Sequence, residues 1–191
     1  MQVSKIKVAL GDRAKVTVDV NQAWTEVEAA LGIEALEAAG IDLIEQPTPR
    51  EQRGALARLA ARFIVPIMAD EGVTGPEDAP ELVRDACADV FALKIAKSGG
   101  IYGMLQRGCG CYTVARCSKE ASARLLLRTA LARFRNWLWG TKLFGPLLIK
   151  DDIVTSRPQY RDFDLHVPQG PGLGLQIDEE KLAFYRRDKK V

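Results

Sequence analysis

The stretch GIDLIEQPTPR, residues 40–50, contains a short apolar run that ends in an acid. Ile41, Leu43 and Ile44 are residue types that favour β-strands, and Gln46-Pro47 closes the run. Glu45 therefore stands at the last position of a predicted strand, where the chain turns. A single glutamate at such a position means little, so its significance depends on whether the pattern recurs.

The pattern recurs in three further apolar runs, each with a charged residue near its end. These runs are KVTVDVN (15–21), PIMADE (66–71) and VFALKIAK (90–97). Successive spacings along Asp19, Glu45, Asp70 and Lys94 are 26, 25 and 24 residues. Alanine-rich and leucine-rich segments of helical character lie between the runs. Strand, helix and strand at this period predict an α/β fold with a parallel sheet, a partial (β/α) barrel of the TIM type.

The charged residues are expected to meet, because the carboxyl ends of barrel strands project into one shared site. Taken singly, each acid is explained by a turn or a helix cap. Asp19, Glu45 and Asp70 in phase instead form a set of carboxylates that repel one another unless a cation lies among them. Oxygen ligands without histidine or thiolate favour Mg²⁺ or Mn²⁺. Lys94 then becomes a candidate acid–base residue beside a metal-bound substrate.

The bulk composition excludes several classes of protein. With 191 residues, 47% apolar and 27% charged, the chain has the composition of a soluble globular protein. A net charge of +2 gives no indication of nucleic-acid binding, and no apolar run is long enough for a signal peptide or a membrane span. The four cysteines lack zinc-site spacing and fit a reduced, cytoplasmic setting.

Several motifs make the chain similar to a known family. VDVNQAW, IDLIEQP, IMADE and FALKIAKSGG resemble the muconate cycloisomerase branch of the enolase superfamily. WGTKLFGPLL, PQYRDFDLHVP and PGLGL resemble the C-terminal segment of that branch. The resemblance covers residues 8–105 and 137–187, and ALKIAKSGG is closer to muconate than to chloromuconate cycloisomerases.

The resemblance implies roles for individual residues. Asp19, Glu45 and Asp70 match the family's metal ligands, and Lys94 matches the lysine that lines the pocket opposite the family's base. Asn21, two residues after Asp19, is a candidate for orienting substrate or metal, with a turn as the equal alternative. The implied cofactor is Mn²⁺, or Mg²⁺ in its place.

The implied reaction is the cycloisomerisation of cis,cis-muconate to muconolactone through a metal-stabilised enolate, in the degradation of catechol and other aromatic compounds. The partner is a small dicarboxylate, with no nucleic acid or membrane, and the parent family forms homo-oligomers. Two alternatives remain open: another enzyme of the superfamily, such as a chloromuconate cycloisomerase or a dipeptide epimerase, and a non-catalytic truncated product.

The N-terminal region departs from the family pattern. The family carries a capping domain and then a K-x-K strand, about one βα unit before the strand of Asp19. Only eighteen residues precede Asp19, and Lys5-Ile6-Lys7 lies in a helix-like segment that we interpret as a solvated helix face. The resemblance therefore implies a C-terminal fragment without the capping domain and without the principal base.

Two later departures affect the chemistry. Lys142 occupies the place of the family's proton-donating glutamate, and an ordinary lysine, with a pKa of about 10.4, donates a proton poorly near neutrality. Residues 106–136 do not resemble the family, and residues 106–139 carry six arginines, one lysine and one acid. Our hypothesis is translation in a shifted frame that is later restored; a divergent basic amphipathic helix is the alternative. CYTVAR, residues 111–116, is a candidate strand within it.

The expected organisation is a partial barrel domain over residues 1–149 and a tail over residues 150–191 that returns, in the family, to the capping domain. Because the base, the donor and the cap are missing or altered, we expect the chain alone to have little or no activity.

Overall fold

A computed structural model describes most of the chain and shows one principal sheet. The described residues are 2–75, 78–94, 96–99, 113–116, 139, 141–142, 145–157, 159–162, 164–166, 170–171 and 174–186. The sheet has the order β1-β2-β3-β4-β5-β6, and every neighbouring pair in it is parallel. Strand order that follows chain order, with every pair parallel, confirms the predicted βαβ architecture of a partial barrel.

Of the six strands, the first four lie within the four predicted apolar runs and are shorter than those runs, and no strand was predicted at the position of the sixth. Their bounds are β1 Thr17–Asp19, β2 Leu43–Glu45, β3 Ile67–Ala69, β4 Val90–Lys94, β5 Thr113–Arg116 and β6 Thr141–Lys142. β5 confirms the expected strand in CYTVAR. The rest of residues 106–136, with the helices expected there, lies outside the described residues.

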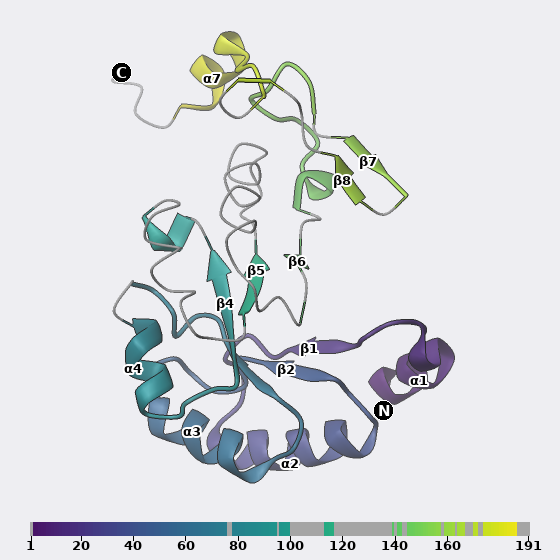
Figure 1. Ribbon diagram of the computed structural model, residues 1–191, viewed down its shortest axis with the longest axis vertical. Helices are drawn as coiled ribbons and strands as arrows, with labels where there is room; N and C mark the ends of the chain where they lie inside the picture. Colours follow the sequence, from purple (N-terminus) through teal and green to yellow (C-terminus); the bar gives the residue numbers. More distant parts are fainter. Residues whose placement is uncertain are drawn as a thin grey trace.

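Three helices cover one face of this sheet: α2 Glu26–Ala38, α3 Arg53–Arg62 and α4 Asp78–Arg84 (Figure 1). α2 begins with a capping box, in which Thr25 and Glu28 exchange side-chain and backbone hydrogen bonds. The Trp24 ring lies so close to α2 at Gly32 that a Cβ added to this glycine would be 2.6 Å from the ring. Trp24 therefore packs against α2 as part of the larger core.

The two faces of the sheet have different partners, as the alternation of strand side chains requires. Ile44, Ile67, Ala69 and Phe91 join the helices in the larger core, where each fully buried large apolar side chain contributes about 1.5–3 kcal/mol. The opposite face carries a smaller cluster, formed by Leu43, Met68, Val90 and Ala92 with Trp139 packed against it.

Trp139 also shows that the sheet curls. Its ring lies 4.4 Å from the Lys15 ammonium, so the chain just before β1 meets the chain just before β6. The first and last strands of the row therefore approach each other at their amino ends. Curvature of this kind is what a barrel interior requires.

At the amino ends of the strands, carboxylates anchor the backbone of neighbouring strands. Asp42 accepts hydrogen bonds from the Val16 amide (2.7 Å) and the Lys7 ammonium (2.6 Å), and Asp89 accepts one from the Ile67 amide (2.8 Å). Lys7 belongs to α1, Gln2–Leu10, which lies beside β1 (Figure 1). Lys5-Ile6-Lys7 is thus helical as predicted, and Lys5 and Ile6 are exposed, but the expectation of a solvated face is wrong for Lys7, whose side chain is 18% exposed because it pairs with Asp42.

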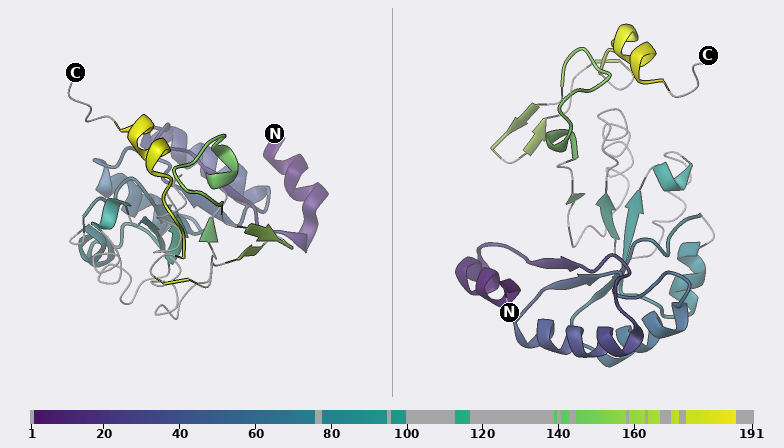
Figure 2. Two further views of the ribbon diagram at one scale, coloured as in Figure 1. Left: turned by 90° about the horizontal axis from the view of Figure 1, so that it is seen from above. Right: turned by 180° about the vertical axis from the view of Figure 1, so that it is seen from behind.

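The tail contains its own small elements: η3 Gly145–Leu148, the antiparallel pair β7 Gln159–Arg161 and β8 Asp164–His166, and α7 Glu179–Tyr185. They lie on the far side of the sheet from α2 and α3 (Figures 1 and 2). Asp151 links the start of the tail to α7 through Lys181 (2.5 Å) and the Tyr185 hydroxyl (3.1 Å). The boundary at residues 149 and 150 stays a prediction.

Candidate functional site

The predicted site residues stand at the carboxyl ends of four consecutive strands. Asp19 is the last residue of β1 and is paired in register with Glu45, the last residue of β2. Asp70 directly follows β3, and Lys94 is the last residue of β4. Adjacent strands lie about 4.8 Å apart, so Asp19 and Glu45 are immediate neighbours.

Register also places the four residues on one face. Glu45 pairs with Met68, so Asp70 lies two residues further along on the next strand. Ala69 pairs with Phe91, which puts Asp70 level with Ala92 and two residues before the level of Lys94. Since side chains alternate with a period of two, all of these residues share the face of the smaller apolar cluster. The candidate site therefore lies above that cluster, on the interior side of the curved sheet.

Asp70 and Lys94 are in direct contact. The Asp70 side chain is only 2% exposed, and its Oδ2 accepts a hydrogen bond of 2.5 Å from Lys94 Nζ. Lys97 Nζ lies 3.4 Å from the other oxygen, Oδ1. Lys97 belongs to η2, Ala96–Ser98, and sequence reasoning missed it. The motif KIAK could have indicated it, because Lys97 follows Lys94 by three residues, and Lys94 ends the strand that carries the predicted pocket lysine.

Glu45 is buried as completely as any residue of the core, with no exposed surface. A carboxylate in such a place is costly unless positive charge or hydrogen-bond donors compensate for the lost water. Burial of Glu45 and Asp70 at one end of one sheet face argues against a solvated turn as the explanation of either acid.

Asp19 is less buried and makes a local contact. Its Oδ1 accepts a hydrogen bond of 3.1 Å from the backbone amide of Asn21, which lies in the turn after β1. Asn21 is exposed and has a φ of 51°, a left-handed conformation that asparagine tolerates better than most residues. The turn accounts for Asn21, and its role toward a substrate stays a prediction.

The three carboxylates have the right chemistry for a hard divalent cation, but their side chains do not gather around one point. Within the described residues, no three histidine, cysteine, aspartate or glutamate side chains are arranged so that they could hold a metal ion. A physical reason is visible at Asp70, whose two oxygens face the ammonium groups of Lys94 and Lys97. A cation bound at Asp70 would have to displace at least one of these lysines.

The backbone register of the sheet also gives the position of Lys142 relative to Lys94. Lys94 pairs in register with Arg116, and Arg116 pairs with Lys142. Lys142 is therefore level with Lys94, two strands further along, at the carboxyl end of β6. Three basic residues in one row on β4, β5 and β6 follow the three acids of β1, β2 and β3.

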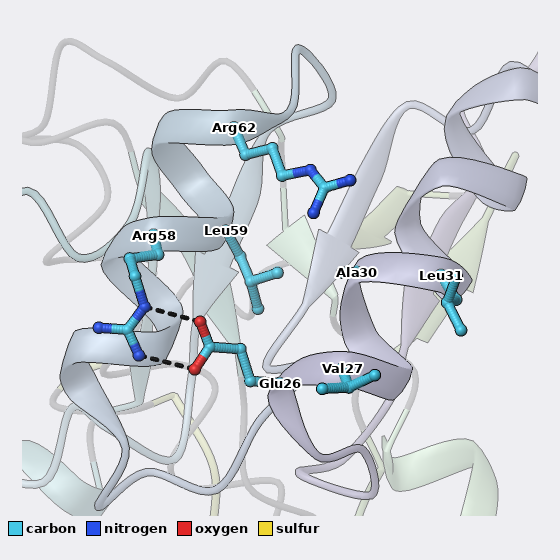
Figure 3. A pocket seen from close by; sticks show the side chains of 7 residues that line it. All are labelled: Glu26, Val27, Ala30, Leu31, Arg58, Leu59 and Arg62. Carbon is cyan, nitrogen blue, oxygen red and sulfur yellow. Dashed lines mark hydrogen bonds and ion pairs between the residues drawn. The ribbon is translucent and has the colours of Figure 1, made fainter.

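An apolar groove in the described part of the chain lies elsewhere. It has a volume of about 470 Å³ and runs between α2 and α3, lined by Glu26, Val27, Ala30, Leu31, Arg58, Leu59 and Arg62. Glu26 and Arg58 bridge it with two hydrogen bonds of 2.6 Å (Figure 3). The groove belongs to the outer helical layer and contains none of the predicted site residues. Among the described residues, no helix has the length and apolar character needed to cross a bilayer.

Comparison with known proteins agrees with this geometry. Residues 1–181 match the model of the enolase C-terminal domain-like family. The chain is 46% identical to Muconate cycloisomerase 1 of Pseudomonas putida, across 97% of this chain and 51% of that protein. It is 36% identical to the chloromuconate cycloisomerase of Pseudomonas sp. strain P51, across 97% of this chain and 52% of that protein.

Solved structures give the same result. The crystal structure of muconate cycloisomerase from Pseudomonas fluorescens superposes with a TM-score of 0.90 at 47% identity, over 97% of this chain and 53% of that one. A structure of muconate lactonizing enzyme from the same species, complexed with muconolactone, superposes equally well. The chain spans about half the length of the relatives it matches. With a family match over nearly its whole length, the chain belongs to the enolase C-terminal domain-like family of the enolase superfamily.

Proposed function

We propose that this chain is part of a muconate cycloisomerase, which converts cis,cis-muconate to muconolactone in the breakdown of catechol and related aromatic compounds. One observation carries the proposal. The residues that match the family's ligands and pocket lysine lie on one face of the sheet, at the carboxyl ends of β1 to β4. The greater identity to muconate than to chloromuconate cycloisomerases, 46% against 36%, favours muconate as the substrate.

Asp19, Glu45 and Asp70 would hold a divalent cation, Mn²⁺ or Mg²⁺, because all three offer carboxylate oxygens and none of the neighbouring donors is a softer ligand. When bound, such a cation supplies the positive charge that makes a proton alpha to a carboxylate acidic enough to move. The chain's own residues have a separate task. Lys94, beside Asp70, offers a mobile ammonium group to one carboxylate of the substrate.

The substrate follows from this arrangement of charge. Muconate carries two carboxylates, and the proposed site offers a cation among β1 to β3 and the ammonium groups of Lys94 and Lys97 beside it. A small dicarboxylate therefore fits the site, whereas the sequence and the described surface give no reason to propose nucleic acid or membrane as a partner. Homo-oligomers and a cytoplasmic location are proposed from the resemblance alone.

Lys142 is the main reason to expect weak turnover. The family uses a glutamate at this position as the proton donor, and lysine brings the opposite charge. We expect the purified chain with Mn²⁺ to form muconolactone slowly or not at all. We expect Lys142→Glu to raise the rate.

The experiment is an assay of muconolactone formation by chromatography, with Mn²⁺ and cis,cis-muconate, for the chain and for Lys142→Glu. Chloromuconate and a dipeptide serve as competing substrates, since a chloromuconate cycloisomerase and a dipeptide epimerase share the same ligand set. Turnover of chloromuconate or epimerisation of the dipeptide in preference to muconate would replace the substrate proposed here. Turnover of the unmodified chain at the rate of a complete enzyme would show that Lys142 is no obstacle.

A non-catalytic protein is the second candidate. It is favoured by one structural observation, that the three carboxylates do not gather into a ligand set while Asp70 binds two lysines. Solubility and oligomer size of the purified chain, together with Mn²⁺ binding, separate the two. A folded chain that binds no Mn²⁺ supports the non-catalytic reading.

A further inference from the structure

Gln46, directly after the proposed ligand Glu45, is the most highly connected polar residue near the site. It is fully buried and adopts a φ of 37°, in the left-handed region that non-glycine residues rarely occupy. Such strain persists only where surrounding contacts hold it, and it is frequent at functional sites. The contacts of Gln46 show what holds it.

The side-chain amide of Gln46 binds the loop that follows β3. Its Oε1 accepts hydrogen bonds from the backbone amides of Asp70 (2.9 Å) and Gly72 (3.2 Å), and its Nε2 donates to the Thr48 carbonyl (3.0 Å). Both ends of the amide are therefore used inside the protein. The Asp70 backbone amide is bound by this side chain rather than by the sheet ladder, because β3 ends at Ala69, and the Asp70 carbonyl accepts a hydrogen bond from the Val73 amide (3.0 Å).

The backbone of Gln46 binds the segments on either side. Its amide donates to the Met68 carbonyl (2.8 Å), and its carbonyl accepts a hydrogen bond from the Gln22 amide (2.8 Å). One residue thus links the segments that follow β1, β2 and β3. These are the same three segments that carry the proposed metal ligands.

We propose that Gln46 is a positioning residue, which holds Asp70 at a fixed height relative to Glu45 so that both carboxylates can reach one divalent cation. The inference rests on the proposed metal site. Buried groups that support ligands commonly set metal affinity through orientation, without contacting the metal themselves. A purely structural role is the competing explanation, and it predicts an effect on stability alone.

Asp89 provides a matched control, because it anchors the opposite end of the same strand. Its Oδ2 accepts a hydrogen bond of 2.8 Å from the Ile67 amide at the start of β3, far from the proposed ligands along the strand. Gln46→Met removes the acceptor at the carboxyl end while keeping the length of the side chain. Asp89→Ala removes the acceptor at the amino end. Both variants should unfold at lower temperature than the unmodified chain.

The test measures Mn²⁺ affinity by electron paramagnetic resonance of free Mn²⁺, with thermal unfolding and hydrogen exchange of the Asp70 and Gly72 amides measured in parallel. We expect Gln46→Met to weaken Mn²⁺ binding by tenfold or more and Asp89→Ala by less than twofold. The inference is overturned if folded Gln46→Met binds Mn²⁺ like the unmodified chain, or if Asp89→Ala weakens binding equally.

Gln46→Asn decides the matter if Gln46→Met does not fold, since it keeps a polar amide but is one methylene too short to reach Asp70. We expect Gln46→Asn to weaken Mn²⁺ binding by tenfold or more, and binding like that of the unmodified chain would overturn the inference. If the unmodified chain binds no Mn²⁺, the metal proposal fails by itself. The positioning role is then judged by hydrogen exchange of the Asp70 and Gly72 amides, which we expect to be faster in both Gln46 variants. Exchange rates equal to those of the unmodified chain would overturn the positioning role.

Discussion

Replacing Lys94 with methionine tests how the buried carboxylate of Asp70 is stabilised. Breaking a buried ion pair by removing one partner costs about 3–5 kcal/mol, since the other charge is left without compensation. Here Asp70 is 2% exposed, but Lys94 is 23% exposed and Lys97 remains 3.4 Å from Oδ1. We therefore expect a smaller loss for Lys94→Met, about 2–3 kcal/mol in the free energy of unfolding. For a chain of this size that is a fall in Tm of roughly 5–10 °C.

The same variant should respond more strongly to metal. With Lys94 absent, a cation at Asp70 competes with one ammonium group instead of two, and ligand binding to the native state stabilises it by RT ln(1 + [L]/Kd). We expect 1 mM Mn²⁺, a concentration on the order of common binding constants, to raise the Tm of Lys94→Met by more than that of the unmodified chain.

Lys7→Met is the control, because Lys7 makes an ion pair of 2.6 Å with Asp42 at the opposite end of the strands. Asp42 is 27% exposed, so the loss should be nearer 1 kcal/mol, as for exposed pairs, and Mn²⁺ should act as on the unmodified chain. Thermal unfolding followed by circular dichroism, with and without Mn²⁺, measures all three proteins. Equal stability of Lys94→Met and the unmodified chain, or a smaller Mn²⁺ response in Lys94→Met, would refute this reasoning.

Two further predictions concern the scaffold. Burial opposes ionisation of Asp78, but hydrogen bonds from Thr74, Gly75 and Arg53 outweigh it and lower the pKa of Asp78 to about 2. The folded pKa lies below the unfolded value of 3.8, so about 2 kcal/mol of stability is present above pH 4 and is lost as the pH falls through 2. Urea unfolding at pH 5 and pH 2 should show the difference between the unmodified chain and Asp78→Asn shrinking at low pH; a constant difference would contradict it. Gly32→Ala should destabilise by about 1–2 kcal/mol despite alanine's higher helix propensity, because the added methyl would lie 2.6 Å from Trp24; a gain in Tm would show that the ring moves aside.

The sequence was sufficient for β1 to β4 and for the positions of the predicted site residues along them. The reason is that parallel βαβ units repeat with a nearly constant length, so charged residues spaced by 26, 25 and 24 positions recur at equivalent places. Glu45 illustrates this, since its register with Asp19 follows from two strands that end at the same height.

The contacts of Gln46 could not be predicted in the same way. Gln46 was interpreted only as the residue that closes a strand, yet its side chain binds amides 24 and 26 residues away in the chain. Hydrogen bonds between loops depend on how the strands are staggered, and residue types alone do not contain that information. The contacts of Asp70 with two lysines are of the same kind, because they depend on where η2 turns after β4.

Charge along the row of strand ends connects these observations. Acids end β1 and β2 and follow β3, whereas Lys94, Arg116 and Lys142 share one level on β4, β5 and β6. A family glutamate in place of Lys142 would change the formal charge of this row by two units toward negative. Because a dication gains more from negative than from positive neighbours, we expect Lys142→Glu to strengthen binding of Mn²⁺ at the proposed site. Asp70, in contact with Lys94 and Lys97, would still have to exchange an ammonium group for the cation, so the gain should be larger in a Lys94→Met background.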